Sequence, residues 1–169
     1  MYGSPFEDLE VGARHVSRGR TVTEADVVGF ATLTGDHHPQ HTDAEWSSRS
    51  PFGERIAHGM LVLSYAAGLV PLDPERVLAL RRVRDAVFKR PVHLGDTIRV
   101  ESRIAATDPA TGAVTCAWDV RNQADRLVAR ATIDLLWRRN EPAGPAPADE
   151  DAPAVDASGM VFAFTSVPL

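Results

Sequence analysis

The residues best suited to chemistry lie together in residues 35–41, which have the sequence GDHHPQH. This segment places a carboxylate, Asp36, five residues before an imidazole, His41. Gly35 and Pro39 favour a loop here, because both residue types interrupt regular structure. A carboxylate and an imidazole that share one water can exchange protons with it. That is general acid–base catalysis, worth roughly 10²–10⁴-fold per group.

A second feature begins 17 residues after His41, where His58 and Gly59 open an apolar run. Residues 60–70 predict a helix that is buried on nearly all sides, since apolar residues surround it. Gly59 offers a backbone amide at the helix start with no side chain in the way, which suits a carbonyl oxygen that gains negative charge. The two features together fit the addition of water to, or its loss from, a carbon beta to a thioester carbonyl.

Composition limits the remaining function classes. The chain has 169 residues, of which 44% are apolar and 24% charged, enough for one domain with a core. The net charge of −5 without a basic run argues against nucleic-acid binding. Residues 59–72, the longest apolar run, are fewer than the roughly 20 that span a bilayer. No signal-peptide pattern is present, so we expect a cytoplasmic protein without membrane association.

Local patterns predict short helices first and long strands later. Residues 13–22 fit one strand. Thr23 and Asp26 signal the start of a helix that ends at Gly35, and a short helix follows Asp43.

The single cysteine, Cys116, is expected in the core. Alternation with period two then predicts four strands, the last three joined by short turns and therefore antiparallel neighbours: from residue 81, 97–107, 113–122 and 127–137.

The composition changes at residue 140. Residues 1–139 are predicted to form the domain. Residues 140–169 are rich in Pro, Ala and acid and predict a flexible tail with a short apolar C-terminal segment. One antiparallel sheet wrapped around a central apolar helix is an α+β arrangement. It leaves sheet edges exposed, so we expect a homodimer or a higher homo-oligomer.

The same residues also allow simpler roles. A glycine followed by an acid after a helix is typical of a C-cap and turn without chemistry. His37, His38 and His41 lie close in sequence, and with His58 they could instead bind a metal, although we expect none. His58 could also serve only to cap the buried helix.

Residues 35–41, followed by IAHGM at 56–60, resemble the MaoC-like dehydratases and (R)-specific enoyl-CoA hydratases. The motif of that family is approximately Gly-Asp-x-Asn-Pro-[Leu/Ile/Val]-His. Further matches are FEDLEVG at 6–12, TVTEAD at 21–26 and RPVHLGDT at 90–97, so that the resemblance covers about residues 5–139 in order.

The resemblance implies a hot-dog fold, in which a sheet curls around the central helix at residues 59–70, and a dimer. It implies that Asp36 and His41 activate water while the Gly59 amide polarises the thioester carbonyl. The reaction is then the reversible hydration of a trans-2-enoyl thioester to its (R)-3-hydroxyacyl form. Coenzyme A or the phosphopantetheine of an acyl carrier protein is part of the substrate, and no separate cofactor is implied. Supporting or pocket positions are His38, Pro39, Gln40, His58 and Met60.

Two positions depart from the family motif. His38 stands in place of Asn, and Gln40 in place of a branched apolar residue, which points to a polar or short substrate or to a weakened enzyme. A basic group nearby supplies candidates for contacts with the carrier phosphate, namely Arg84, Lys89 and Arg90.

Two alternatives stay open. One is a hot-dog thioesterase, although residues 60–70 contain no Asp or Glu to act as its carboxylate. The other is a catalytically silent subunit that binds thioesters or supports assembly. The acyl chain, the carrier, the physiological direction and the pathway are not determined by the sequence.

Overall fold

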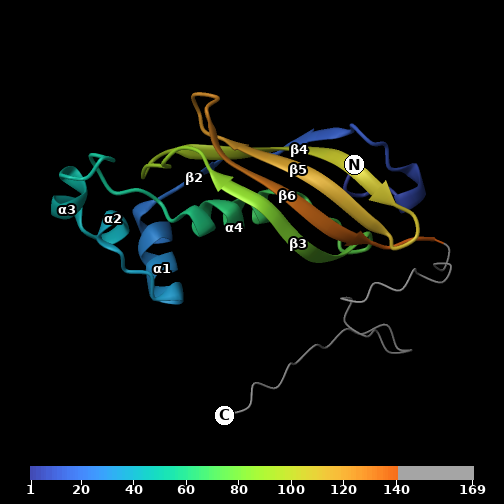
Figure 1. Cartoon of the computed structure of the whole chain (residues 1–169), viewed down its shortest axis with the longest axis horizontal. Helices are drawn as coiled ribbons and strands as arrows, with labels where there is room; N and C mark the ends of the chain where they lie inside the picture. Colours follow the sequence, from blue (N-terminus) through green and yellow to red (C-terminus); the bar gives the residue numbers. More distant parts are fainter. Residues whose placement is uncertain (141–169) are drawn as a thin grey trace, which may run out of the picture.

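A computed structural model describes residues 1–140 of the chain. Its main feature is a six-stranded antiparallel sheet in the order β1-β4-β5-β6-β3, with β2 pairing with β4 (Figure 1). The strands are β1 (Arg14–Val16), β2 (Arg20–Thr21), β3 (Val77–Phe88), β4 (Thr97–Asp108), β5 (Ala113–Arg121) and β6 (Leu127–Trp137). The α-helices are α1 (Glu24–Thr34), α2 (Pro39–Thr42), α3 (Ala44–Ser48) and α4 (Gly59–Leu69), and a 3₁₀ turn covers Phe6–Asp8.

Helix α4 lies along the sheet and contacts β4 and β6, while α1, α2 and α3 gather beyond one end of the sheet (Figure 1). The core lies between α4 and the sheet. Alternate residues of β5 point into it, as predicted, and all four are buried: Val114, Cys116, Trp118 and Val120. The prediction of one antiparallel sheet against one apolar helix is confirmed.

Helix α1 begins where its N-cap signal predicts. The Thr23 hydroxyl accepts from the Asp26 amide at 3.3 Å, and the Asp26 carboxylate accepts from the Thr23 amide at 2.8 Å. This reciprocal pair satisfies two amides that a helix start leaves free. At the other end Gly35 adopts a left-handed conformation with φ of 77°. Residues with a Cβ atom rarely adopt this conformation, so glycine is favoured here. The chain therefore turns sharply just before Asp36.

The single strand predicted for residues 13–22 is wrong, because it divides into β1 and β2. Both pair with β4, and Ser17 lies at the break. The Ser17 hydroxyl accepts from the Val100 amide at 2.9 Å, so a side chain replaces the backbone acceptor that a continuous strand would offer. The bond joins residues 83 positions apart and leaves no local pattern in the sequence.

The loop predicted for residues 35–41 is partly wrong, because Pro39 to Thr42 form the helical turn α2. Proline is compatible with the first helical position, where its missing N–H would have no partner. His38 Nδ1 accepts from the Gln40 amide at 3.2 Å and caps the turn. His41 therefore lies on a helical turn rather than in a loop, which fixes its backbone.

The apolar composition of helix α4 predicts burial on nearly all sides, but one side of the helix is exposed. Leu61, Val62 and Leu63 are buried, but Met60 is 56% exposed. Ser64 and Gly68 follow Met60 at four-residue spacing and are also exposed, so that one stripe of the helix faces away from the core.

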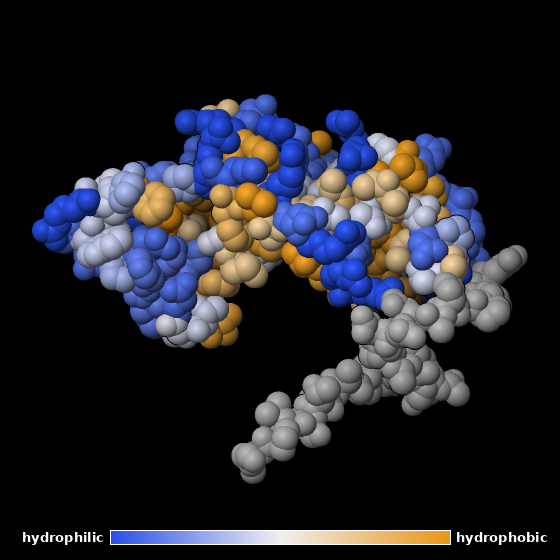
Figure 2. Space-filling model, in the orientation of Figure 1, coloured by the Kyte–Doolittle hydropathy of each residue, from blue (hydrophilic) through white to orange (hydrophobic). Residues whose placement is uncertain are grey.

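Strand β3 forms one edge of the sheet and begins at Val77, four residues before the predicted start. The strict alternation predicted for this strand is wrong, because its pairing with β6 shifts three times and Asp85 has φ of 51°. Apolar side chains of this strand are exposed: Leu78, Leu80, Val83, Val87 and Phe88. Figure 2 shows apolar surface interleaved with hydrophilic surface over the part of the face where β3 runs in Figure 1.

The predicted tail at 140–169 lies outside the described residues except for Asn140. The Asn140 amide donates to the Glu7 carboxylate at 3.0 Å, which ties the end of the domain to its N-terminal segment. Within residues 1–140, none of the helices is both long enough and apolar enough to cross a membrane.

The Cys116 thiol lies fully inside the core, and burial raises its pKa to about 11. At pH 8 about one molecule in a thousand would carry the reactive thiolate. We expect no reaction of the native protein with Ellman's reagent, and one thiol per chain after unfolding in guanidinium chloride. Rapid labelling of the native protein would show that β5 does not pack as described.

Candidate active site

Asp36 follows the left-handed turn at Gly35 and is exposed. Its carboxylate accepts from the His38 amide at 3.2 Å, which fixes the short segment between α1 and α2. Its backbone carbonyl accepts from His58 Nε2 at 3.0 Å. The carboxylate is thus held by its own loop, and the loop is held by the residue that precedes α4.

His41 is buried, with 4% of its surface exposed. Its Nδ1 lies 2.7 Å from the Ile56 carbonyl oxygen. Because a carbonyl only accepts, Nδ1 carries the hydrogen, and in the neutral ring the lone pair is on Nε2. Gln40 Nε2 lies 3.0 Å from that nitrogen. Nε2 is thus the acceptor atom of the neutral ring, and the Gln40 amide nitrogen is placed to donate to it.

His58 is 2% exposed and stacks on His41, with ring centroids 3.7 Å apart and planes at 24°. Phe30 of α1 contacts the His58 ring at a centroid distance of 5.0 Å. The His58 Nδ1 atom has no hydrogen-bond partner within residues 1–140. His58 therefore packs against His41, α1 and the Asp36 loop at once, and it provides no side-chain cap to α4.

The structure brings Asp36, His41 and His58 together. A carboxylate oxygen and one ring nitrogen from each histidine lie within 4.8 Å of one another. A water with two hydrogen bonds of about 2.8 Å can span that separation between Asp36 and His41. The two side chains are placed to share a single water.

Of the four histidines considered as metal ligands, two come together in the part of the chain that the structure describes, namely His41 and His58. His37 and His38 are exposed and lie outside the group formed by Asp36, His41 and His58. His38 packs edge-on against Trp46, with ring centroids 5.5 Å apart, and its Nδ1 caps α2. The role of His38 visible here is to shape the loop that carries Asp36.

The start of α4 presents a free amide. No acceptor for the Gly59 N–H occurs within residues 1–140, and His58 does not cap it. The Phe88 ring packs over Gly59, and a Cβ at this position would lie 2.9 Å from its Cε2 atom. A glycine is thus required for the close approach of Phe88, a contact across 29 residues of chain that no local sequence pattern indicates.

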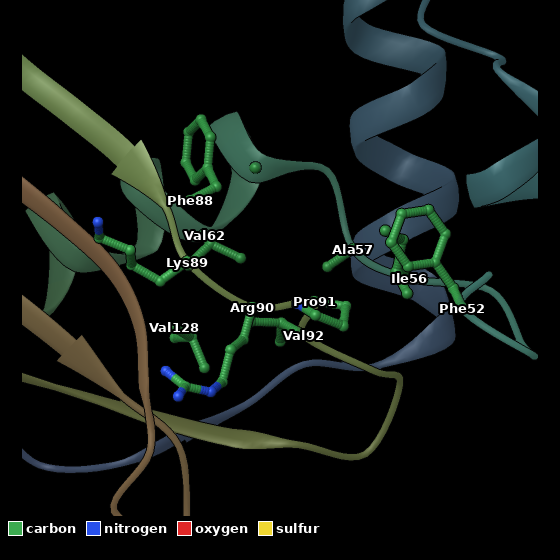
Figure 3. A pocket seen from close by; sticks show the side chains of 11 residues that line it. Phe52, Ile56, Ala57, Val62, Phe88, Lys89, Arg90, Pro91, Val92 and Val128 are labelled. Atoms are coloured by element: carbon green, nitrogen blue, oxygen red, sulfur yellow. The ribbon is translucent and has the colours of Figure 1, made fainter.

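A cavity of about 270 Å³ opens beside Gly59 (Figure 3). Its walls are mostly apolar, and Figure 3 shows Phe88 and Phe52 on opposite sides of it. Asp36 and His41 do not line it; Ile56, whose carbonyl binds His41, connects it to the pair. The full lining is Phe52, Ile56, Ala57, Gly59, Val62, Phe88, Lys89, Arg90, Pro91, Val92 and Val128.

The three basic residues predicted for a carrier phosphate differ in position. Lys89 and Arg90 line the cavity, whereas Arg84 does not. Arg84 instead forms two hydrogen bonds with the Asp134 carboxylate, at 2.8 and 3.1 Å. Arg90 donates to the Leu127 carbonyl at 2.8 Å. Neither Lys89 nor Arg90 has an ion-pair partner among residues 1–140, so both bring positive charge to the cavity. Met60, also predicted near the site, is exposed and does not line this cavity.

Residues 10–121 match the family model described as MaoC like domain. A 3-hydroxybutyryl-CoA dehydratase of Methylorubrum extorquens is 37% identical over 123 residues, which are 66% of this chain and 73% of that protein. The structure of R-Hydratase PhaJ1 from Pseudomonas aeruginosa has 32% identity and a TM-score of 0.69, covering 86% of this chain and 95% of that one. A MaoC-like dehydratase from Rhodospirillum rubrum has 29% identity and a TM-score of 0.72, covering 82% of this chain and all of that one (100%).

The protein therefore belongs to the MaoC-like domain family. Its sheet wrapped along α4 is the hot-dog fold that the sequence resemblance implied, and this prediction is confirmed.

Burial lowers the pKa of His41, while the bond to the Ile56 carbonyl acts in the opposite direction. The folded protein then binds fewer protons at this site than the unfolded chain, where a histidine titrates near about pH 6.5. The stabilisation is complete above that pH and is lost as the pH falls through it toward the lower folded pKa. We expect the free energy of unfolding, measured by denaturant titration, to decline less steeply in His41→Asn than in wild type from about pH 7.5 to pH 5.

The exposed His37 provides the matched control. A His37→Asn variant should give a curve parallel to wild type. A His41→Asn curve that is also parallel would contradict the depressed pKa of His41.

Proposed function

We propose that the protein catalyses the reversible addition of water to a 2-enoyl thioester, which yields an (R)-3-hydroxyacyl thioester. The observation that carries the proposal is that Asp36 and His41 lie within reach of one water and are grouped with His58, the residue directly before the Gly59 amide. The names of the relatives support it, since one is a 3-hydroxybutyryl-CoA dehydratase and another an R-hydratase.

In the hydration direction, the water donates one hydrogen bond to the Asp36 carboxylate, and it donates a second to His41 Nε2 when the Gln40 amide turns away from that nitrogen. Its oxygen forms a bond to C3 of the enoyl group as one of its protons passes to the Asp36–His41 pair. The electrons of the C2–C3 double bond move toward the thioester carbonyl, whose oxygen gains negative charge. The Gly59 amide and the positive end of α4 stabilise that charge. The pair then returns one proton to C2, and no net proton is gained or lost.

The cavity beside Gly59 suits the substrate in both polarity and charge. Its apolar wall fits an acyl or pantetheine chain, and Lys89 supplies a positive charge for the phosphates of coenzyme A. We propose an acyl-CoA as substrate. The support is that a relative is named 3-hydroxybutyryl-CoA dehydratase and that this chain matches 73% of the length of that relative.

Replacing either member of the pair tests the assignment. Asp36→Asn and His41→Ala should each lower the hydration of crotonyl-CoA by roughly 10²-fold or more, because each removes an acid–base group. The measurement is the disappearance of the enoyl thioester, followed by chromatography of the 3-hydroxyacyl product. Glu45→Gln, an exposed carboxylate on neighbouring α3, is the matched control and should turn over like wild type.

Wild-type rates in either variant would show that the residue concerned is not part of the machinery. Release of free coenzyme A without a 3-hydroxyacyl product would instead identify a thioesterase. Binding of crotonyl-CoA without turnover in wild type would identify a silent subunit.

We also propose that two copies associate through the face of β3. Edge strand β3 is 12 residues long and exposes five apolar side chains, Phe88 at the cavity among them. An exposed apolar edge of this length is normally covered by another chain or element. A second copy packed here would also help to enclose the cavity, since Phe88, Lys89 and Arg90 lie at the end of this strand.

Val83→Lys on β3 should convert the proposed dimer to a monomer, because it places a charge on the apolar face. The measurement is size-exclusion chromatography coupled to light scattering at about 10 µM protein. Val16→Lys is the matched control, because Val16 is an exposed valine on β1, at the opposite edge of the sheet. A dimer that survives Val83→Lys and dissociates with Val16→Lys would place the interface on the other edge.

A further inference from the structure

Gln40 contacts His41 at the nitrogen that the reaction requires. Its side-chain Nε2 lies 3.0 Å from His41 Nε2. The backbone of Gln40 is held on both sides, since its N–H donates to His38 Nδ1 at 3.2 Å and its carbonyl accepts from the Ile56 amide at 3.1 Å. The Gln40 side chain therefore starts from a fixed backbone, and only its own torsions decide which amide atom faces His41.

The direction of this bond follows from the other side of the imidazole. His41 Nδ1 donates to the Ile56 carbonyl at 2.7 Å, so the neutral ring can only accept at Nε2. The amide nitrogen of Gln40 is the donor in that state. When His41 takes a proton, Nε2 becomes a donor as well, and two N–H groups would then face each other.

A half turn of the Gln40 amide removes this conflict, because it brings the carbonyl oxygen to the position of the nitrogen. The terminal torsion of glutamine is broad and nearly two-fold, so both orientations are accessible without moving the backbone. We propose that Gln40 is a positioning residue whose amide turns over as His41 gains and loses its proton, keeping Nε2 hydrogen-bonded in both states. The proposal rests on the hydration mechanism above, in which His41 exchanges protons.

The turn has a definite consequence for the titration of His41. The bond from the imidazolium to the Gln40 carbonyl is charge-assisted and stronger than the bond to the neutral ring. Gln40 then favours the protonated state relative to an apolar side chain of the same length. An amide fixed as a donor would act in the opposite direction, since it would bind only the neutral ring. The sign of the change on replacing Gln40 therefore separates the two possibilities.

Other ionisable groups around His41 stay in place in such variants. They are His58, which stacks on the ring from the start of α4, Asp36 from the loop after α1, and His38 at the start of α2. Since these three groups are common to every variant, a difference between variants reports on position 40.

The experiment is an NMR titration of the full-length protein with ¹⁵N-labelled histidine, in which the His41 resonances are assigned by their loss in His41→Ala. Relative to wild type, the pKa of His41 should fall by about half a unit or more in Gln40→Met and rise by a similar amount or more in Gln40→Glu. Methionine matches glutamine in length, and glutamate matches it in shape with a permanent acceptor. The limb of the pH profile of kcat/KM that reports His41 should shift in the same directions, to lower pH in Gln40→Met and to higher pH in Gln40→Glu.

A His41 pKa in Gln40→Met equal to or above the wild-type value would overturn the proposal, because it would show a fixed donor or no coupling. The titration needs no turnover, so it separates this proposal from the enzymatic one. If the pKa order holds while crotonyl-CoA is not hydrated, the proposed function fails and the amide turn stands. If hydration occurs and the order fails, only the amide turn is refuted.

Discussion

The site depends on how His58 is packed. One ring nitrogen of His58 binds the Asp36 carbonyl, and the ring face lies on His41. The next residue is Gly59, whose amide begins α4. A single buried side chain thus joins the loop that carries the carboxylate, the imidazole and the helix start. Without it these groups would depend on three separate elements, and the distances between them would vary independently.

The rest of the fold holds that arrangement against the sheet. Helix α4 packs on β4 and β6, and the end of β3 brings Phe88 over Gly59. Position 59 serves both the helix start and the cavity wall, because a side chain there would exclude Phe88. The exposed stripe of α4 and the exposed face of β3 are left for another surface to cover.

Local signals in the sequence predicted the elements that local interactions define. The Thr23–Asp26 cap and the bounds of β6 were correct, because capping and alternation act over a few residues. The break at Ser17 was missed, since its hydroxyl binds a residue on β4 that is far away in sequence. The turn α2 was missed because Pro39 was treated as a helix breaker, although it is favourable at a first helical position.

The site shows the same division. The spacing of Asp36 and His41 predicted that they could meet, and they do. The Ile56 carbonyl, which fixes the tautomer of His41, and the Gln40 amide, which binds its other nitrogen, were not predicted. A backbone carbonyl carries no residue-type signal, and a side-chain contact between neighbours on a helical turn is not indicated by helical spacing.

The most direct test of this account is a crystal structure of the Asp36→Asn variant with crotonyl-CoA bound. In the proposed mechanism the thioester oxygen lies within about 3.2 Å of the Gly59 nitrogen, and C3 faces the side chains at positions 36 and 41. A thioester whose oxygen lies away from Gly59, or whose C3 faces the opposite side of the cavity, would contradict it.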